Sequence, residues 1–277
     1  MTQIPVDNEI HLPREALPAK QMEKLIQRLT VPNPEYIARK RMGKWLGGVP
    51  ESIECFRFEN GSIAIPRGAA RLLKELTIET GTTLHYVDRR LSFPFVAYPI
   101  AISPRAYQAE AIARMTGATQ GVVVMPCGGG KSLTGVGVVI RLGQPTIFLV
   151  HTLDLVEQWR DLLNGLGVQD VGIVCDGVNK PEMITLATVQ TLAGRDAGDP
   201  LFRQFGCVIQ DEGHHVPGYT FRDVLNRFPA KHRFALTATP DRADGLTDLL
   251  FHYVGPILHE VDFGFLVKNG FLIEPEI

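Results

Sequence analysis

Six short apolar runs, separated by segments of helix length, constrain the fold between residues 102 and 236 more than any other feature. Strands that are apolar along their whole length are typical of a parallel sheet covered by helices on both faces, because neither face meets water. We therefore predict an α/β domain with a mostly parallel sheet. Its expected strands are residues 121–125, 146–150, 171–174, 183–187, 207–210 and 233–236.

The first hundred residues have a mixed, short-range pattern that predicts a small α+β domain. Apolar residues at helical spacing indicate a helix over residues 20–29. Residues 55–58 and 63–66 read as two strands joined by an Asn60-Gly61 hairpin turn, and residues 84–87 as another strand. Two prolines within residues 92–99 interrupt any regular element, so we place the domain boundary there.

A glycine-rich turn follows the first strand of the predicted parallel sheet and reads Met125-Pro126-Cys127-Gly128-Gly129-Gly130-Lys131-Ser132. Consecutive glycines let backbone N–H groups surround a phosphate, and the next helix adds the positive end of its dipole. We expect Lys131 to reach the β- and γ-phosphates of a nucleotide and Ser132 to bind Mg²⁺. The strict P-loop pattern has glycine where this sequence has Met125. The expected nucleotide-binding loop residues are Cys127, Gly128, Gly129, Gly130, Lys131 and Ser132.

Two adjacent carboxylates, Asp211 and Glu212, follow the apolar strand at residues 207–210. Hydrolysis of a phosphoanhydride needs one carboxylate for the metal and another group that orients and deprotonates the attacking water. We assign Asp211 to Mg²⁺ and Glu212 to the general base, with Lys131 as the third catalytic residue. A phosphate loop alone would fit kinases, GTPases and motor ATPases equally, so this second site favours ATP hydrolysis.

The order of the motifs resembles that of superfamily 2 helicases of the DExH type. Residues 125–132 resemble motif I, Asp211-Glu-Gly-His214 resembles motif II with Gly213 where many members have Ala, and Leu236-Thr-Ala-Thr-Pro240 resembles motif III. Three further segments resemble the Q motif, motif Ia and a strand-end motif that touches nucleic acid; they are residues 104–108, 151–159 and 185–190. Within the superfamily, the sequences of these motifs are most similar to those of the XPB and UvsW branch.

The resemblance implies a RecA-like ATP-binding domain at residues 96–262. It implies an accessory domain at residues 1–95, in the position where the family has a damage-recognition domain. It also implies that a linker starts at residues 263–277. The linker would lead to a second RecA-like domain, which supplies an arginine finger. The sequence contains no motif of that second domain. We therefore expect this chain to be one part of a longer motor or one half of a split motor, which binds nucleotide but hydrolyses it slowly.

Several residues receive roles from the resemblance and from their chemistry. Gln108 can read the adenine edge through its amide, and Arg105 can support the loop or the base. The hydroxyls of Thr237 and Thr239 are expected to transmit the state of the γ-phosphate to the nucleic-acid surface. His214 is expected to form a hydrogen bond with motif III or with the second motor domain. Ala243 stands where XPB-type proteins have the glutamate of an Arg-Glu-Asp element, so the resemblance does not carry that element's function to this chain.

Two groups of residues are candidate contacts to DNA. Thr152 and Thr188 lie at strand ends, where hydroxyl and backbone N–H groups can bind phosphates without reading the sequence. One basic run has an aromatic residue nearby and comprises Arg39, Lys40, Arg41, Lys44 and Trp45. It fits a site that tracks a phosphate backbone and stacks Trp45 on a base, and it equally fits a solvated helix face with a tryptophan in the core. These motifs do not distinguish RNA from DNA.

Composition restricts the class of protein more than its partner. Hydrophobic residues make up 45% and charged residues 21%, as in a globular protein and unlike a disordered one. Residues 1–100 carry 14 Lys and Arg against 11 Asp and Glu, whereas the remainder carries 14 against 19, so the front leans basic. Four widely spaced cysteines argue against a disulfide framework or a zinc site. No leader or membrane span is evident, so we expect a cytoplasmic protein (host cytoplasm if phage-encoded, nucleus if eukaryotic) with no membrane partner.

The leading prediction is the N-terminal portion of an ATP-dependent DNA helicase or translocase with ATP and Mg²⁺ as cofactors. One alternative is the motor subunit of a restriction or defence system, which uses the same chemistry beside a nuclease. The other is a nucleotide-dependent DNA-binding module that does not hydrolyse ATP.

Overall fold

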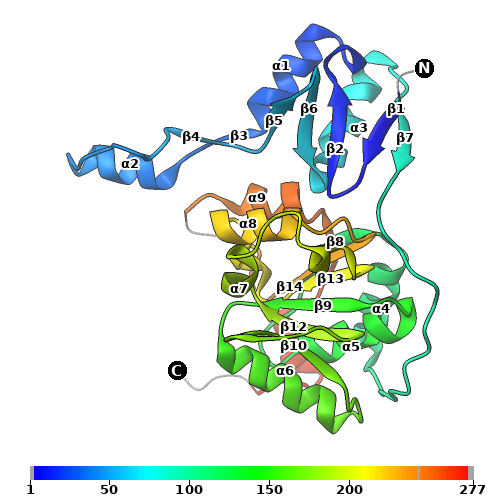
Figure 1. Cartoon of the computed structure of the whole chain (residues 1–277). Helices are drawn as coiled ribbons and strands as arrows, with labels where there is room; N and C mark the ends of the chain where they lie inside the picture. Colours follow the sequence, from blue (N-terminus) through cyan, green and yellow to red (C-terminus); the bar gives the residue numbers. More distant parts are fainter. Residues whose placement is uncertain (1–2, 242–243, 274–277) are drawn as a thin grey trace.

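A computed structural model describes residues 3–241 and 244–273 of the chain. The strands form a five-stranded sheet, an eight-stranded sheet and a two-stranded ribbon (Figure 1). All strands of the five-stranded sheet come from the first 88 residues, and all strands of the eight-stranded sheet from residue 120 onward. The fold class predicted from the sequence, a RecA-like α/β domain after a small α+β domain, is confirmed.

The five-stranded sheet has the order β5-β6-β2-β1-β7 and is antiparallel except between β1 and β7. Its helices α1 and α3 are joined by the ion pairs Lys24–Glu79 and Arg28–Glu75. The predicted helix and hairpin are confirmed, and Asn60 and Gly61 supply the positive φ angles, 40° and 81°, that a two-residue turn requires. The elements are β1 (Gln3–Val6), β2 (Glu9–Pro13), η1 (Arg14–Ala16), α1 (Ala19–Arg28), β5 (Arg57–Glu59), β6 (Ser62–Pro66), η2 (Arg67–Ala69), α3 (Ala70–Thr80) and β7 (His85–Asp88).

An arm, defined here as residues 30–54, leaves this sheet between α1 and β5 (Figure 1). It consists of the antiparallel ribbon β3 (Thr30–Pro32) and β4 (Ser52–Glu54), which carries the short helix α2 (Pro34–Arg41). Asn33 closes the base of α2, since its side chain accepts from the Glu35 backbone N–H and donates to the Pro50 carbonyl. The arm therefore holds its basic residues away from both cores.

The eight-stranded sheet has the order β11-β10-β12-β9-β13-β14-β8-β15, and every pairing except β10–β11 is parallel. The six predicted strands are confirmed. Strands β11 and β15 were not predicted, because their exposed or half-exposed residues do not form an apolar run. The strands are β8 (Gln120–Val124), β9 (Thr146–Val150), β10 (Val171–Cys175), β11 (Val178–Lys180), β12 (Ile184–Thr188), β13 (Cys207–Gln210), β14 (His232–Thr237) and β15 (Ile257–Glu260).

Helices cover both faces of this sheet, and alternate residues of β8 divide between the two cores. Val123 and Met125 pack with residues of α4, α5 and α6, whereas Val122 and Val124 belong to a core that includes α8, α9 and the apolar interior of the small domain. In Figure 1, α8 and α9 lie between the two sheets. The remaining elements are α4 (Ala106–Thr116), α5 (Lys131–Leu142), α6 (Leu153–Gly165), α7 (Val189–Ala193), η3 (Pro200–Arg203), η4 (Gly213–His215), α8 (Tyr219–Asn226), α9 (Thr247–Tyr253) and α10 (Phe263–Lys268).

Residues 92–105, which include the predicted boundary, contain no helix or strand. The exact division at residue 95 stays a prediction. Among the described residues, no helix is both long and apolar enough to cross a lipid bilayer.

Two buried arginines join the small domain to the large sheet. Arg67 donates to the carbonyls of Asp7, Ala230 and Lys231 and to Oε1 of Gln120. Arg233 donates to the carbonyls of Asn8, Phe228 and Tyr253. Neither guanidinium forms an ion pair within residues 3–241 and 244–273, and burial lowers the pKa of Arg67 well below its usual value and that of Arg233 to about 10. Uncharged oxygens, from backbone carbonyls and from the side-chain amides of Gln120 and Asn226, therefore accept the hydrogen bonds of two buried cations at this junction.

Replacement of Arg67 tests this junction. Arg67→Met keeps a long apolar stem but leaves the carbonyls of Ala230 and Lys231 without their donor, so we expect the free energy of unfolding in urea to fall by about 3 kcal/mol. Arg71→Met is the matched control, because Arg71 is exposed and pairs only with Glu75, and it should change the value by less than about 0.5 kcal/mol. Equal effects of the two substitutions would contradict the role given to Arg67.

Candidate nucleotide site

Three neighbouring strands of the large sheet, β8, β14 and β13, end at the same edge and bring the predicted motifs together. The glycine-rich loop follows β8, Asp211 and Glu212 follow β13, and Thr237 ends β14. Because the three strands are parallel, all of these residues meet at the carboxyl edge of the sheet. Lys131 Nζ lies 4.0 Å from Glu212 Oε1, which places the two main motifs in contact.

The loop has the backbone geometry of a phosphate cradle. Gly128 and Gly130 have φ angles of 76° and 85°, in the left-handed region that favours glycine, and Gly130 caps the N-terminus of α5. The Lys131 side chain is largely buried and its Nζ donates to the Met125 carbonyl at 3.4 Å. Ser132 stands in the first turn of α5, and Cys127 is exposed. The turn thus presents a helix N-terminus and one ammonium group to the same space, as a polyphosphate requires.

Asp211 is held by hydrogen bonds to both of its carboxylate oxygens. Oδ2 accepts from the indole Nε1 of Trp159 at 2.7 Å, and Oδ1 accepts from the backbone N–H of Glu212 at 2.9 Å. Only 5% of Asp211 is exposed, so these bonds offset the cost of burying the carboxylate. The described residues include no cluster of three His, Cys, Asp or Glu side chains able to hold a metal ion. Asp211 and Ser132 therefore fit a Mg²⁺ that takes its other ligands from phosphate and water.

Trp159 is a site residue that the sequence reasoning missed. It belongs to α6, and its ring packs on Phe148 of β9 with centroids 4.2 Å apart. The sequence Leu-Val-Glu-Gln-Trp of motif Ia could have indicated this role, because a buried indole N–H needs a hydrogen-bond acceptor.

Glu212 occupies a strained backbone conformation beside the loop. Its φ angle of 49° lies in the left-handed region, which costs a residue other than glycine about 1 kcal/mol or more. Its carboxylate lies 3.3 Å from Nδ1 of His214. Gly213, where many relatives of the motif have Ala, packs so closely on β14 that an added Cβ would lie 2.8 Å from the Ala235 Cβ. The glycine therefore permits the turn that presents Glu212.

A chain of contacts leads from Glu212 into motif III. His214 Nδ1 lies 3.4 Å from the hydroxyl of Thr237, and this buried hydroxyl donates to the Thr239 carbonyl at 2.9 Å. The structure thus brings His214, Thr237 and Thr239 together. Arg242 and Ala243 of the Arg-Glu-Asp-like element lie outside the described residues.

The side chain of Gln108 contacts the backbone of the phosphate loop. Its Oε1 accepts from the Arg105 backbone N–H at 2.8 Å, and its Nε2 donates to the Gly129 carbonyl at 3.1 Å. Each end of the amide thus has one partner within the chain. Because the amide also has a second N–H and a further lone pair, the contact with adenine stays a prediction. Tyr107, which the sequence reasoning also missed, donates to the same Gly129 carbonyl at 3.0 Å.

The candidate DNA contacts do not form one site. Thr152 is exposed and caps α6 by accepting from the Leu155 N–H. Thr188 is only 5% exposed and donates its hydroxyl to Thr191, so its side chain is buried, and its contact with a phosphate stays a prediction. The reason is that β12 is buried along its whole length.

The basic residues of the arm lie apart from both threonines and are accessible. Arg39 pairs with Glu35, Lys40 lies over the Tyr36 ring, and Arg41 and Lys44 are exposed. Trp45 is 80% exposed, which excludes the interpretation of a core tryptophan. The arm therefore combines cations with an accessible aromatic ring.

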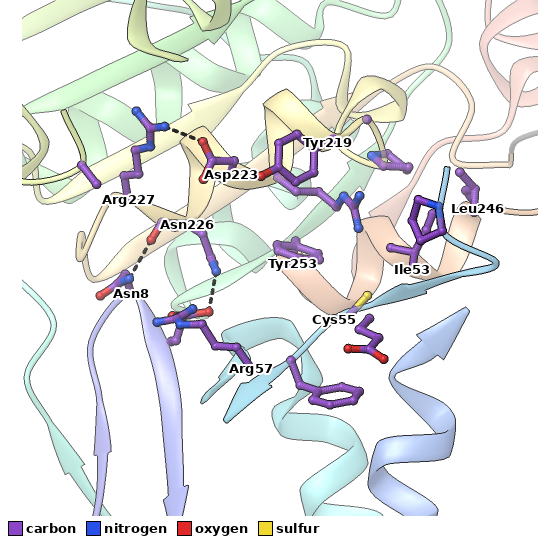
Figure 2. A pocket seen from close by; sticks show the side chains of 18 of the residues that line it. Asn8, Ile53, Cys55, Arg57, Tyr219, Asp223, Asn226, Arg227, Leu246 and Tyr253 are labelled. Carbon is purple, nitrogen blue, oxygen red and sulfur yellow. Dashed lines mark hydrogen bonds and ion pairs between the residues drawn. The ribbon is translucent and has the colours of Figure 1, made fainter. Parts of the chain in front are cut away.

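A cavity of about 1170 Å³ lies between the base of the arm and α8 (Figure 2). Asn226 bonds across the junction to Asn8 and Glu9, whereas Arg57 pairs with Glu9 within the small domain and Arg227 pairs with Asp223 at the end of α8. None of the predicted nucleotide-binding residues lines it. The cavity is therefore distinct from the site at the strand ends.

Comparisons with known proteins show what the chain is similar to. The family model described as "Type III restriction enzyme, res subunit" matches residues 101–242, half of the chain. The Rad25 protein of Haloarcula marismortui is 36% identical over 178 residues, 62% of this chain and 28% of that protein. The DNA 3′-5′ translocase XPB2 of Sulfurisphaera tokodaii is 33% identical over 168 residues, 61% of this chain and 38% of that protein. The crystal structure of the UvsW helicase from bacteriophage T4 matches with a TM-score of 0.68 at 15% identity, over 93% of this chain and 100% of that one.

The fold is a RecA-like domain preceded by a small α+β domain. The chain belongs to the Type III restriction enzyme, res subunit family and is similar in sequence to XPB-type helicases of superfamily 2. The likeness to UvsW extends through the accessory domain and shows the fold alone. The chain spans about a third of the length of the two curated relatives.

The bond between Trp159 and Asp211 yields a prediction. Trp159→Phe keeps a ring against Phe148 but leaves a buried carboxylate oxygen without a donor, which costs about 2 kcal/mol. We expect Mg²⁺-ATP binding, measured by calorimetry, to weaken about tenfold because the metal ligand loses its orientation. Trp45→Phe, at an exposed tryptophan, should bind as the unchanged chain does. Wild-type affinity in Trp159→Phe would show that the indole does not position Asp211.

Proposed function

We propose that this chain is the N-terminal portion of an ATP-dependent motor that moves on DNA or remodels it. Residues 1–95 form its accessory domain, residues 96–262 its first RecA-like domain, and residues 263–277 the start of a linker to a second RecA-like domain in the same chain or a partner. The observation that carries the proposal is the approach of Lys131 Nζ to within 4.0 Å of Glu212 Oε1 at the carboxyl edge of the sheet. The residues of motifs I and II are thereby positioned to act on one nucleotide.

The chemistry follows from the groups at this edge. The loop from Cys127 to Ser132 holds the phosphates through backbone N–H groups, and Lys131 places its charge against the β- and γ-phosphates. Ser132 and Asp211 would hold Mg²⁺, which would neutralise charge on the phosphates. Glu212 orients the attacking water and accepts its proton. The left-handed backbone at Glu212 and the bond from its N–H to Asp211 keep the base beside the metal ligand.

Coupling to movement follows the contacts out of Glu212. His214 lies between the Glu212 carboxylate and the Thr237 hydroxyl, at 3.3 Å and 3.4 Å. A change at the γ-phosphate that displaces Glu212 therefore alters the bond between Thr237 and the Thr239 carbonyl. Efficient hydrolysis needs an arginine finger from the second RecA-like domain, so the present chain alone should hydrolyse ATP slowly.

DNA is the proposed track, because the XPB2 relative carries the name DNA 3′-5′ translocase and the arm offers accessible cations beside Trp45. Arg39, Lys40, Arg41 and Lys44 would bind backbone phosphates, with Thr152 as a further contact at a strand end. RNA remains a competing substrate to be compared directly. The description of the family favours a second candidate function, the motor of a restriction system. A nuclease or methyltransferase acting with the same polypeptide would distinguish the two.

The ATP site is tested by Lys131→Ala and Glu212→Gln. Lys131→Ala removes a cation from the phosphates and should weaken Mg²⁺-ATP binding at least about tenfold. Glu212→Gln removes the base and should retain binding while lowering DNA-stimulated ATP hydrolysis by about 10² or more. Hydrolysis is measured with single-stranded DNA, duplex, forked DNA and RNA, on the chain together with its second RecA-like domain. Activity that survives both substitutions would refute the site.

The arm yields a prediction about nucleic acid. Replacing Arg39, Lys40 and Arg41 by Ala removes three phosphate contacts, so DNA binding should weaken and the slope of log K against log salt should become shallower by about 2 to 3. The matched control replaces Lys20, Arg71 and Lys74, three exposed cations of α1 and α3, and should leave the slope unchanged. An identical slope in the arm variant and the wild type would exclude the arm as a contact.

A further inference from the structure

The segment after the last strand folds back over the Q-motif residues. Helix α10 begins at Phe263, and the side chain of the preceding Asp262 caps it by accepting from the Phe265 N–H. The chain then reverses after the helix, so that the Phe271 N–H donates to the Leu266 carbonyl at 2.8 Å. This reversal places the Phe271 ring over the guanidinium of Arg105, with Cζ 4.6 Å from the ring centroid. The same ring lies 5.4 Å from that of Tyr107.

These contacts put Phe271 at the border of the phosphate loop. Tyr107 donates to the Gly129 carbonyl and accepts a bond from Arg105 Nη1 at 3.3 Å. The next residue, Leu272, touches the loop itself, because a Cβ added at Gly128 would lie 2.7 Å from Leu272 Cδ2. A nucleotide whose phosphates fill the loop would extend its base toward this group of side chains.

We propose that Phe271 is a base-stacking residue, and that the purine of the nucleotide inserts between its ring and the Arg105 guanidinium. The inference rests on the proposed ATP site and adds the residue that recognises the base. An aromatic ring and a planar guanidinium both stack on a base, and such stacking requires no particular hydrogen-bond pattern. Here the two flat groups already face each other without a base between them.

Insertion requires Phe271 to move outward. A base between two flat groups needs a separation of about 7 Å, two van der Waals contacts of about 3.5 Å each. The 4.6 Å separation must therefore grow by roughly 2.5 Å. The backbone hydrogen bonds of Asn269, Gly270, Phe271 and Leu272 all go to residues 265–267 of the same segment, so the turn can shift without breaking them. Base binding then also displaces the proposed linker, which connects the nucleotide to the second domain.

The test compares a ligand that has a base with one that lacks it. Phe271→Leu keeps an apolar side chain but removes the ring, so we expect the affinity for Mg²⁺-ATP to fall about tenfold while the affinity for Mg²⁺-tripolyphosphate is unchanged. Phe271→Trp should bind ATP at least as tightly as the wild type. Phe263→Leu, at an exposed ring of α10 in the same segment, is the matched control and should bind both ligands normally.

Three results would overturn the inference. Unchanged ATP affinity in Phe271→Leu would show that the ring does not contact the base, and tighter ATP binding would show that the ring obstructs the base site. An equal loss of ATP and tripolyphosphate affinity would also contradict stacking. Failure of the proposed function gives a different result from failure of this inference. If the ATP site is wrong, the wild type would bind neither ATP nor tripolyphosphate, or Lys131→Ala would leave ATP binding unchanged.

Discussion

The burial of Asp211 at the end of β13 is the constraint on which the site depends. A carboxylate that is only 5% exposed is unfavourable unless both oxygens have donors, and here one donor comes from a helix and the other from the next residue. The indole of Trp159 reaches Asp211 only when α6 packs on β9, as the contact between Trp159 and Phe148 shows. The metal ligand is therefore positioned by the packing of a helix face and not by the motif alone. The strained turn at Glu212 follows directly, since its N–H supplies the second donor.

A second constraint fixes the small domain relative to the α/β domain. One hydrophobic core continues from the small domain to α8, α9 and one face of the large sheet, and Arg67 and Arg233 close its polar edge. Gly68 lies so close to the Phe251 and His252 carbonyls that a Cβ there would collide with backbone. A rigid junction keeps the arm at a set position with respect to the strand ends. A partner bound by the arm would thus be presented to the motor in one orientation.

The sequence predicted those parts of the structure that depend on local signals. Continuous apolar runs predicted six strands, and the glycines, Lys131 and the adjacent carboxylates predicted the site, because these features follow from short stretches of chain. Other features depend on contacts between distant residues. The bond of Trp159 to Asp211 spans 52 positions, the burial of Thr188 depends on its neighbours in the sheet, and the exposure of Trp45 depends on the ribbon that carries α2. Gln108 was assigned to adenine, whereas the fold gives its amide two partners within the chain.

The most direct test of the account is a crystal structure of the chain with Mg²⁺ and a non-hydrolysable ATP analogue. The account predicts the β- and γ-phosphates on the backbone N–H groups of the glycine-rich loop and on Lys131, with Mg²⁺ bound by the Ser132 hydroxyl and facing Asp211. Glu212 should then point to the position of a water in line with the γ-phosphate. A triphosphate bound elsewhere, for example in the cavity between the arm and α8, or a metal remote from both Ser132 and Asp211, would contradict it.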